Sequence, residues 1–330
     1  MSHWLAPVLP ECDRRCHDIT PCLCPLTLKR CERMVTGPLL ITGGSGQVGG
    51  AVADLLMAQN QSFWAPDRQH LNLGDPQALS EAVRAKPWSA IINCAAYTAV
   101  DQAEKEPELA AAINTAAPAA LAEAAARASI PFLHVSTDYV FDGTKLTPYT
   151  ETDRVNPLSV YGRTKEAGEA AIRAANGQHA IIRTAWVVNA GGANFLNTML
   201  RLGAERPELR VVKDQIGCPS SANDIAAALL HVAAHLAGRS GTWHFVNAGE
   251  TSWHGLAEHI FAETARRGLP TPALTPITTA DYPTPARRPA NSRLSTAALE
   301  RDFAIKPRLW QDAIDAILAH RLGAEKGDTP

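Results

Sequence analysis

Three glycines at a fixed spacing, Gly43, Gly46 and Gly49, limit the fold of this chain more than any other feature. They follow a short apolar run at residues 38–42 and precede a helical pattern at residues 48–58. At a strand-to-helix turn, the first glycine permits the tight turn, the second lets the backbone approach a pyrophosphate, and the third lets helix and strand pack closely. The helix N-terminus then favours the negative charge of a diphosphate. The spacing predicts a dinucleotide site, whereas without the flanking strand and helix it would describe only an ordinary glycine-rich loop.

The rest of the chain alternates strand and helix patterns, which indicates an α/β fold with a Rossmann-type, doubly wound parallel sheet. Short apolar runs predict strands at residues 62–65, 90–96, 132–136 and 180–183. Helical patterns lie between them, at residues 75–85, 108–129 and 159–174. We expect residues 37–187 to form an NAD(P)-binding domain, with part of 215–247 returning to it. Residues 188–214 and 248–322 are expected to form a smaller C-terminal α/β substrate-binding domain, with a proline-rich surface loop at 270–291.

Tyr161 and Lys165 are four residues apart in a helical pattern, so both side chains lie on one helix face. An ammonium group beside the phenol can lower the phenol pKa and make Tyr161 a usable proton donor for carbonyl reduction. Lys165 can also bind the ribose of a nicotinamide cofactor. Thr137, at the end of a predicted strand, can hydrogen-bond the carbonyl oxygen, because ligands of such sheets bind at the carboxyl ends of the strands. These three residues are the predicted catalytic group; the alternative is a half-buried tyrosine beside a solvated lysine.

The loop after the second predicted strand contains the residues that distinguish the two nicotinamide cofactors. An acid binds the ribose 2′-hydroxyl of NADH, whereas an arginine binds the 2′-phosphate of NADPH. Asp67 and Arg68 offer both groups, so the sequence leaves the choice open, with Arg68 favouring NADPH. Asn72 and Leu73 are candidates to flank the adenine, or are plain loop residues.

The charge balance argues against two classes of partner. The formal net charge is −2, which suggests neither nucleic acid nor an anionic membrane surface. The longest apolar runs, such as residues 90–96, are far too short to cross a bilayer. The N-terminal segment lacks the apolar core of a signal peptide, so we expect a cytoplasmic protein.

Most of the cysteines lie near the N-terminus. Cys12, Cys16, Cys22 and Cys24 could form a metal knuckle or a small disulfide cluster, but no histidine pair completes a zinc spacing. Met34 stands just before the first strand pattern. We therefore expect residues 1–33 to be a disordered or mis-started extension, and we expect no metal site.

Several longer segments match one family. They are Gly43-Gly-Ser-Gly-Gln-Val-Gly49, Asn93-Cys-Ala-Ala-Tyr-Thr-Ala-Val-Asp101, Ser136-Thr-Asp-Tyr-Val-Phe-Asp-Gly143, Pro157-Leu-Ser-Val-Tyr-Gly-Arg-Thr-Lys165, Arg183-Thr-Ala-Trp186, Asp214-Gln-Ile-Gly-Cys-Pro219 and Arg288-Pro-Ala-Asn-Ser-Arg-Leu294. From about Leu39 to Leu318 the chain resembles the dTDP-4-dehydrorhamnose reductase family of extended short-chain dehydrogenases/reductases. The resemblance implies reduction of the 4-keto group of dTDP-4-dehydro-L-rhamnose by NADPH or NADH, which gives dTDP-L-rhamnose in the last step of its biosynthesis.

The same resemblance implies roles for individual residues. It makes Thr137, Tyr161 and Lys165 the catalytic set. Residues against the cofactor would include Gln47, Val48, Ala96, Tyr97, Thr98, Tyr161 and Lys165. The sugar pocket would include Val100, Thr137, Asp138, Tyr139 and Trp186. An indole offers a sugar apolar area and one donor, although Trp186 could also be a core residue. Arg288 and Arg293 are candidates for the substrate diphosphate, or are solvated surface residues.

Two other functions stay open from the sequence. One is another NAD(P)-dependent nucleotide-sugar enzyme, a reductase, epimerase or dehydratase; a dehydratase normally has an Asp-Glu pair where this chain has Asp138-Tyr139. The other is a non-catalytic, nucleotide-binding regulatory subunit. Some members of the family bind Mg²⁺ through glutamates at a dimer contact, but Ala51 occupies the position of one acid, which argues against Mg²⁺ here. We expect a monomer or a homodimer.

Overall fold

The computed structural model describes residues 37–175 and 177–324, so the predicted extension at residues 1–33 lies outside the described residues. A six-stranded sheet has the strand order β10-β5-β4-β3-β1-β2, and every pair in it is parallel. The strands are β1 (Leu39–Thr42), β2 (Phe63–Trp64), β3 (Ala90–Asn93), β4 (Phe132–Thr137), β5 (His179–Thr184) and β10 (Gly241–His244). After β2, at one edge, the chain crosses back to β3 on the other side of β1, so the strand order reverses at β1 and β3. This topology confirms the predicted doubly wound α/β fold, in which ligands bind at that reversal.

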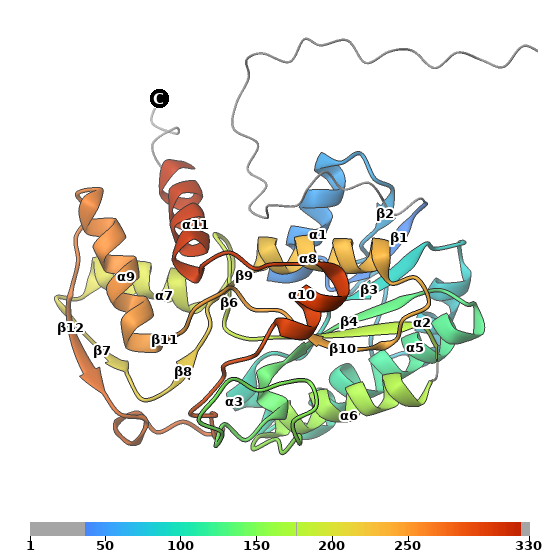
Figure 1. Ribbon diagram of the computed structural model, residues 1–330, viewed down its shortest axis with the longest axis horizontal. Helices are drawn as coiled ribbons and strands as arrows, with labels where there is room; N and C mark the ends of the chain where they lie inside the picture. The colour runs from blue at the N-terminus through green and yellow to red at the C-terminus, as the bar shows by residue number, and fades with distance from the viewer. Residues whose placement is uncertain (1–36, 176, 325–330) are drawn as a thin grey trace, which may run out of the picture.

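Helices cover both faces of the sheet (Figure 1). One face carries α1 (Gln47–Ala58), α8 (Ala222–His235) and the short α10 (Ala297–Phe303), and the other carries α2 (Pro76–Arg84), α5 (Ala117–Arg127) and α6 (Val160–Ala174). On the first face Val52 and Ile225 meet Ile41 in one apolar cluster, and on the second Leu121 and Ile172 belong to another. Because full burial of one such side chain stabilises a fold by about 1.5–3 kcal/mol, these two clusters fix the helices on the sheet.

The helical stretch Pro107–Arg127 differs from the regular helix that its alanine content predicts. A π-helix, η1 (Ala112–Ala116), joins α4 (Pro107–Ala111) to α5. Among the described helices, this stretch alone is long and apolar enough to cross a bilayer. Charged and polar residues interrupt it, so it is not one of the long apolar runs of the sequence. Part of it is buried between the sheet and its neighbours, as Leu121 is, and the core helix of a soluble protein passes the same test.

The C-terminal half builds a second layer of helices over a small ribbon. Its elements are α7 (Phe195–Glu205), β7 (Glu208–Val212), α9 (Trp253–Arg266), β12 (Ala273–Ile277) and α11 (Trp310–Ala324). The predicted loop at residues 270–291 is wrong over β12, which pairs in parallel with β7. Pro276 lies inside β12, and a proline is tolerated at the edge of a sheet because it removes only an N–H that needs no ladder partner. The density of prolines therefore concealed a strand.

Short strand pairs link the two halves. They are β6 (Val187–Val188) with β9 (Ser220–Ser221), and β8 (Ile216–Gly217) with β11 (Thr251–Ser252). The remaining short elements are α3 (Val100–Ala103) and the 3₁₀ turns η2 (Asp138–Val140) and η3 (Thr279–Asp281).

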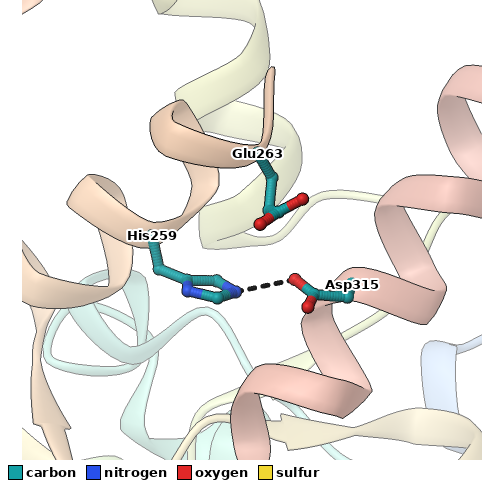
Figure 2. A group of neighbouring side chains, drawn as sticks. All are labelled: His259, Glu263 and Asp315. Atoms are coloured by element: carbon teal, nitrogen blue, oxygen red, sulfur yellow. Dashed lines mark hydrogen bonds and ion pairs between the residues drawn. The ribbon is translucent and has the colours of Figure 1, made fainter. Parts of the chain in front are cut away.

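Polar side chains as well as apolar packing join α9 to α11. Figure 2 shows His259 and Glu263, one helical turn apart on α9, facing Asp315 of α11. His259 Nε2 lies 2.7 Å from a carboxylate oxygen of Asp315, and Glu263 is paired with Arg266. The potential ligand atoms of the three residues lie within 4.8 Å of one another. The contact between His259 and Asp315 is therefore an interhelical hydrogen bond.

Candidate active site

A cavity of about 800 Å³ opens at the carboxyl ends of β1 and β3, next to the glycine-rich turn. Most of the predicted cofactor residues line it, namely Gly43, Gly46, Gln47, Val48, Arg68, Asn72, Leu73, Ala96, Tyr97 and Thr98. The lining does not include Gly49, Tyr161 or Lys165. It does include Ser45, Pro66 and Asn189, which the sequence did not single out. The structure thus brings together segments that are far apart in the sequence.

Close backbone contacts explain two of the three glycines. Gly43 has φ +75°, and a Cβ there would lie 2.6 Å from the backbone nitrogen of Ala95. A Cβ on Gly49 would lie 2.2 Å from the carbonyl oxygen of Gly43, so the start of α1 packs directly on the turn. Gly46 is the N-cap of α1 and supplies no side-chain cap, and the first turn contains no acid. Amides that no side chain caps, at the positive end of a 12-residue helix, fit a diphosphate.

Asp67 and Arg68, the two residues that could bind the cofactor ribose, differ in their surroundings. The Asp67 carboxylate accepts hydrogen bonds from the backbone N–H groups of Gln69 and His70, and it contacts the His70 ring at 2.7 Å. These bonds lower the pKa of Asp67, and the hydrogen bond with the His70 side chain has the largest effect. Arg68 is exposed at the cavity wall. Both residues therefore line the cavity, but the acid is also hydrogen-bonded within its own loop.

A buried asparagine that the sequence did not single out holds the opposite wall. Asn114 projects from the π-helix η1; its Oδ1 accepts from the backbone N–H of Tyr97 at 2.8 Å, and its Nδ2 lies 3.1 Å from Thr164 Oγ1. A Cβ on Gly168 of α6 would lie 2.2 Å from the Asn114 carbonyl oxygen. π-Helices occur often at functional sites, and this one clamps the cavity loop at Tyr97 onto α6.

Tyr161 lies against the end of β4, as predicted for a proton donor. The side chain of Thr137 lies beside the Tyr161 hydroxyl, and the Tyr161 ring meets the edge of the Tyr139 ring with centroids 5.5 Å apart. Thr137 Oγ1 donates to Asp138 Oδ1 at 3.0 Å. Asp138 Oδ2 is buried without a hydrogen-bond partner among the described residues. Burial raises the pKa of Asp138 to about 6, and the nearby hydroxyls of Ser292 and then Thr137 oppose the rise.

Local packing at the start of α6 sets the position of Tyr161. Ser159 is the N-cap, and its hydroxyl oxygen accepts from the Gly162 N–H at 3.1 Å. A Cβ on Gly162 would lie 2.2 Å from the carbonyl oxygen of Tyr139, so only a glycine lets α6 approach η2 so closely. The predicted helix start is therefore correct, and the glycine after Tyr161 brings the phenol to Thr137.

Lys165 is also buried, with 1% of its surface exposed. Its ammonium nitrogen, Nζ, donates to the carbonyl oxygen of Val135 at 2.7 Å and lies 3.0 Å from His134 Nε2. Burial lowers the pKa of Lys165 to about 8, although the charges of Glu169 and Cys94 oppose this.

The expected lowering of the Tyr161 pKa is not observed. Burial raises it to about 12, the hydrogen bond with Thr137 opposes the rise, and the charge of Asp138 adds to it. The physical reason is that desolvation disfavours the phenolate more than the neighbouring groups favour it, and the Lys165 nitrogen is directed at β4.

The predicted sugar-pocket residues lie on several elements around Tyr161. Val100 begins α3, Asp138 and Tyr139 form η2, and Trp186 follows β5 with φ +48°. The indole of Trp186 stacks on Trp253 of α9, with ring centroids 3.4 Å apart. Trp253 is a further residue that the sequence did not single out.

A second cavity, of about 650 Å³, lies under α7 and α9 and includes Trp253. Arg288 also lines it and forms an ion pair with Asp101 at 2.8 Å. The other arginine candidate, Arg293, pairs with Glu250 at 3.1 Å and is not in this lining. The two arginine candidates therefore lie in different surroundings.

Known proteins resemble this chain over nearly all of its described length. A family model described as RmlD substrate binding domain matches residues 37–322. A dTDP-4-dehydrorhamnose reductase of Sinorhizobium fredii (strain NBRC 101917 / NGR234) is 43% identical over 290 residues, which cover 83% of this chain and 94% of that protein. The crystal structure of a dTDP-4-dehydrorhamnose reductase from Clostridium acetobutylicum ATCC 824 has a TM-score of 0.82 at 38% identity, covering 86% of this chain and 99% of that one. That of the Bacillus anthracis str. Ames reductase, in complex with NADP, has a TM-score of 0.80 at 31% identity, with the same coverage. The chain therefore belongs to the dTDP-4-dehydrorhamnose reductase family.

Proposed function

We propose that this chain reduces the 4-keto group of dTDP-4-dehydro-L-rhamnose with NAD(P)H to give dTDP-L-rhamnose. The observation that carries the proposal is the placement of the Tyr161 phenol beside Thr137, at the carboxyl end of β4. Lys165 lies one helical turn beyond Tyr161. Family membership selects the nucleotide sugar among the carbonyl compounds that such a site could reduce.

The residues around the glycine-rich turn fit a nicotinamide dinucleotide. The amides at the start of α1 would hold the diphosphate, and Asn72 and Leu73 would flank the adenine. Ala96, Tyr97 and Thr98 would lie along the opposite wall, with Gln47 and Val48 beneath. Bound in this way, the reduced cofactor supplies the hydride for the carbonyl carbon.

The chain's own residues manage the proton. Tyr161 donates its phenol proton to the carbonyl oxygen, and Thr137 hydrogen-bonds that oxygen and orients it. Because burial raises the pKa of Tyr161 to about 12, the resting phenol keeps its proton, and the phenolate left behind needs a nearby cation. Lys165 supplies that cation as an ammonium.

The second cavity is proposed to receive the nucleotide part of the substrate. Its lining combines Phe195, Met199 and Trp253 with Arg206, Arg210 and Arg288. Apolar surface suits a base, and guanidinium groups suit a diphosphate. Trp253 lines this cavity and stacks on Trp186 of the proposed sugar pocket, so the two sites are neighbours. On this view residues 188–214 and 248–322 bind the nucleotide part of the substrate, and residues 37–187 bind the cofactor and the sugar.

Arg68→Ala is expected to weaken the use of NADPH selectively. Both Asp67 and Arg68 line the cavity, but Asp67 already accepts hydrogen bonds from its own loop, so we propose that Arg68 is the residue that contacts the ribose and that NADPH is preferred. A hydrogen bond to a charged group contributes about 1.5–3 kcal/mol, so kcat/KM for NADPH should fall about 10- to 100-fold. The value for NADH should change little. Steady-state kinetics with both cofactors measures this, and an equal loss for both would contradict the assignment.

The proposed reaction is tested by following the absorbance of NADPH with dTDP-4-dehydro-L-rhamnose generated enzymatically in the cuvette. Consumption of NADPH with formation of dTDP-L-rhamnose, identified by mass and NMR, supports the proposal. Cofactor binding without turnover, on this ketone and on other 4-keto nucleotide sugars, would point to a regulatory subunit. Turnover only on another nucleotide sugar would keep the mechanism and change the substrate.

A further inference from the structure

Buried polar side chains form a line across three neighbouring strands and end at the proposed catalytic lysine. Thr42 of β1, Asn93 of β3 and His134 of β4 are register partners, and each is at most 2% exposed. Thr42 Oγ1 donates to Asn93 Oδ1 at 2.5 Å, and Asn93 Nδ2 lies 3.0 Å from His134 Nδ1. His134 Nε2 lies 3.0 Å from Lys165 Nζ. Each side chain in this line therefore constrains the protons on the next.

The backbone fixes which way the Asn93 amide points. Asn93 Oδ1 accepts from the backbone N–H of Ala95 at 3.1 Å, in addition to the Thr42 hydroxyl. Turning the amide over would place its NH₂ group against the Ala95 N–H, and two donors facing each other in a buried site are strongly disfavoured. Asn93 Nδ2 is therefore the donor toward His134 Nδ1.

This donor fixes the tautomer of His134. Burial and the charge of Lys165 hold the pKa of His134 well below its ordinary value, so the ring is neutral. A neutral ring that accepts at Nδ1 has its proton on Nε2, which is the nitrogen that faces Lys165. An Nε2–H can donate to the lone pair of a Lys165 amine. A Lys165 ammonium has no lone pair, so its N–H donors would face the Nε2–H donor.

We propose that His134 is a positioning residue that sets the protonation state of Lys165: it donates a hydrogen bond to the Lys165 amine and so favours the amine over the ammonium. The proposal rests on the function proposed above, in which Lys165 acts beside Tyr161. Reduction needs the ammonium, because Tyr161 becomes a phenolate when it gives up its proton. The rate of reduction is therefore at its maximum when the pH is below the pKa of Lys165, and it falls as the pH rises through that pKa.

Other charged and titratable groups around Lys165 set where this titration lies. Glu169, on the same helix, favours the ammonium but is engaged by Arg183 of β5. Cys94, just after β3, also favours it, and Tyr161 lies one turn earlier on α6. Burial outweighs these charges and lowers the pKa of Lys165 to about 8, which is the direction that a donor at His134 Nε2 also favours.

The tautomer is measured on the free enzyme, without substrate. Nitrogen-15 NMR of the histidine rings distinguishes Nε2–H from Nδ1–H, and the His134 signals are assigned by their loss in His134→Gln. We expect a neutral Nε2–H ring that does not titrate near the ordinary histidine value of 6.5. An Nδ1–H ring, or a ring that titrates near that value, would overturn the proposal. Because this readout needs no turnover, it is independent of whether the proposed reaction is correct.

The consequence for catalysis is measured from pH profiles of kcat for reduction. In His134→Gln the amide can turn its oxygen toward Lys165. In Asn93→Asp the new carboxylate accepts a hydrogen bond from His134 Nδ1–H, so His134 Nε2 carries no proton and accepts a hydrogen bond from the Lys165 ammonium. Both changes favour the ammonium, and the alkaline loss of activity should move up by at least about one pH unit. Ser136→Ala is the matched control, since it removes a buried hydrogen bond to Glu169 from the same strand. Because Arg183 still keeps Glu169 ionised through two hydrogen bonds, this variant should leave the profile in place. Variants that lose stability or rate without any shift of the profile would show that His134 has a structural role alone.

Discussion

Tyr161→Phe should lower kcat for reduction by about 100- to 10,000-fold, the range that positioned acid–base groups contribute. The variant keeps the ring that packs against Tyr139 and loses the hydroxyl group that donates the proton. Neither Tyr161 nor Thr137 lines the dinucleotide cavity, so the dissociation constant for NADPH should stay within a small factor of the parent value. Stopped-flow reduction and fluorescence titration of NADPH measure the two quantities separately.

Tyr149→Phe is a matched control for this result. Its hydroxyl donates to Asp142 at 2.8 Å, and its ring stacks on Phe141, so this variant also removes a partly buried tyrosine hydroxyl. It should keep nearly full turnover, with a modest loss of stability. If Tyr161→Phe retained turnover similar to that of Tyr149→Phe, the proton would have to come from another group, and the buried Asp138, whose pKa is raised to about 6 by burial, would be the next candidate.

The sequence was most informative where a local rule requires a particular residue. Gly43 needs a positive φ and Gly49 needs contact with a carbonyl oxygen, so their spacing between a strand pattern and a helix pattern identifies the turn. Ser159 caps α6, and the four-residue spacing of Tyr161 and Lys165 follows from the helix itself. These features depend on residues close in the chain, so they could be read before the fold was seen.

Features that depend on distant residues could not be predicted in this way. Asn114 reaches Tyr97 because a π-helix turns it inward, and Trp186 meets Trp253 across the two halves of the molecule. The one signal for His134 was a histidine inside an apolar strand pattern, which does not say what it contacts. The pKa of Tyr161 was predicted in the wrong direction for the same reason, because burial is a property of the whole fold.

A buried ion pair stands behind the proposed catalytic helix. Glu169, one turn after Lys165, is 0% exposed, and Arg183 of β5 is 3% exposed. The guanidinium Nε and Nη2 donate to the two carboxylate oxygens at 2.9 and 2.6 Å. Burial raises the pKa of Glu169, but the hydrogen bonds and charge of Arg183 outweigh it, so the net shift is downward. The pair thus fixes α6 to the sheet while keeping a buried carboxylate ionised.

Arg183→Met should reduce the free energy of unfolding by up to roughly 3–5 kcal/mol, the usual cost of removing one partner of a buried pair. Arg173, whose Nη1 donates to Glu169 Oε2 at 3.1 Å, is more exposed and leaves the carboxylate only part of its counter-charge. Methionine fills much of the same space, so the loss reflects the stranded Glu169 carboxylate more than a cavity. Urea unfolding followed by circular dichroism measures it. The double variant Arg183→Met/Glu169→Leu should recover most of the loss, because an apolar replacement of a whole buried pair is often neutral or stabilising.

The pH dependence separates this electrostatic cause from loss of packing. In the parent protein the pKa of Glu169 lies below its ordinary value of 4.5, so the contribution of the pair is fully present above that value and is lost as the pH falls through the depressed pKa. In Arg183→Met, burial without the guanidinium should raise the pKa of Glu169 above 4.5. Acidification then protonates the stranded carboxylate in the folded variant first, and the stability difference between parent and variant should shrink as the pH falls toward 4.5. A difference that stays constant over that range would mean that Arg183 stabilises the fold through its packing on Phe141, where its guanidinium lies 5.0 Å from the ring centroid, rather than through its charge.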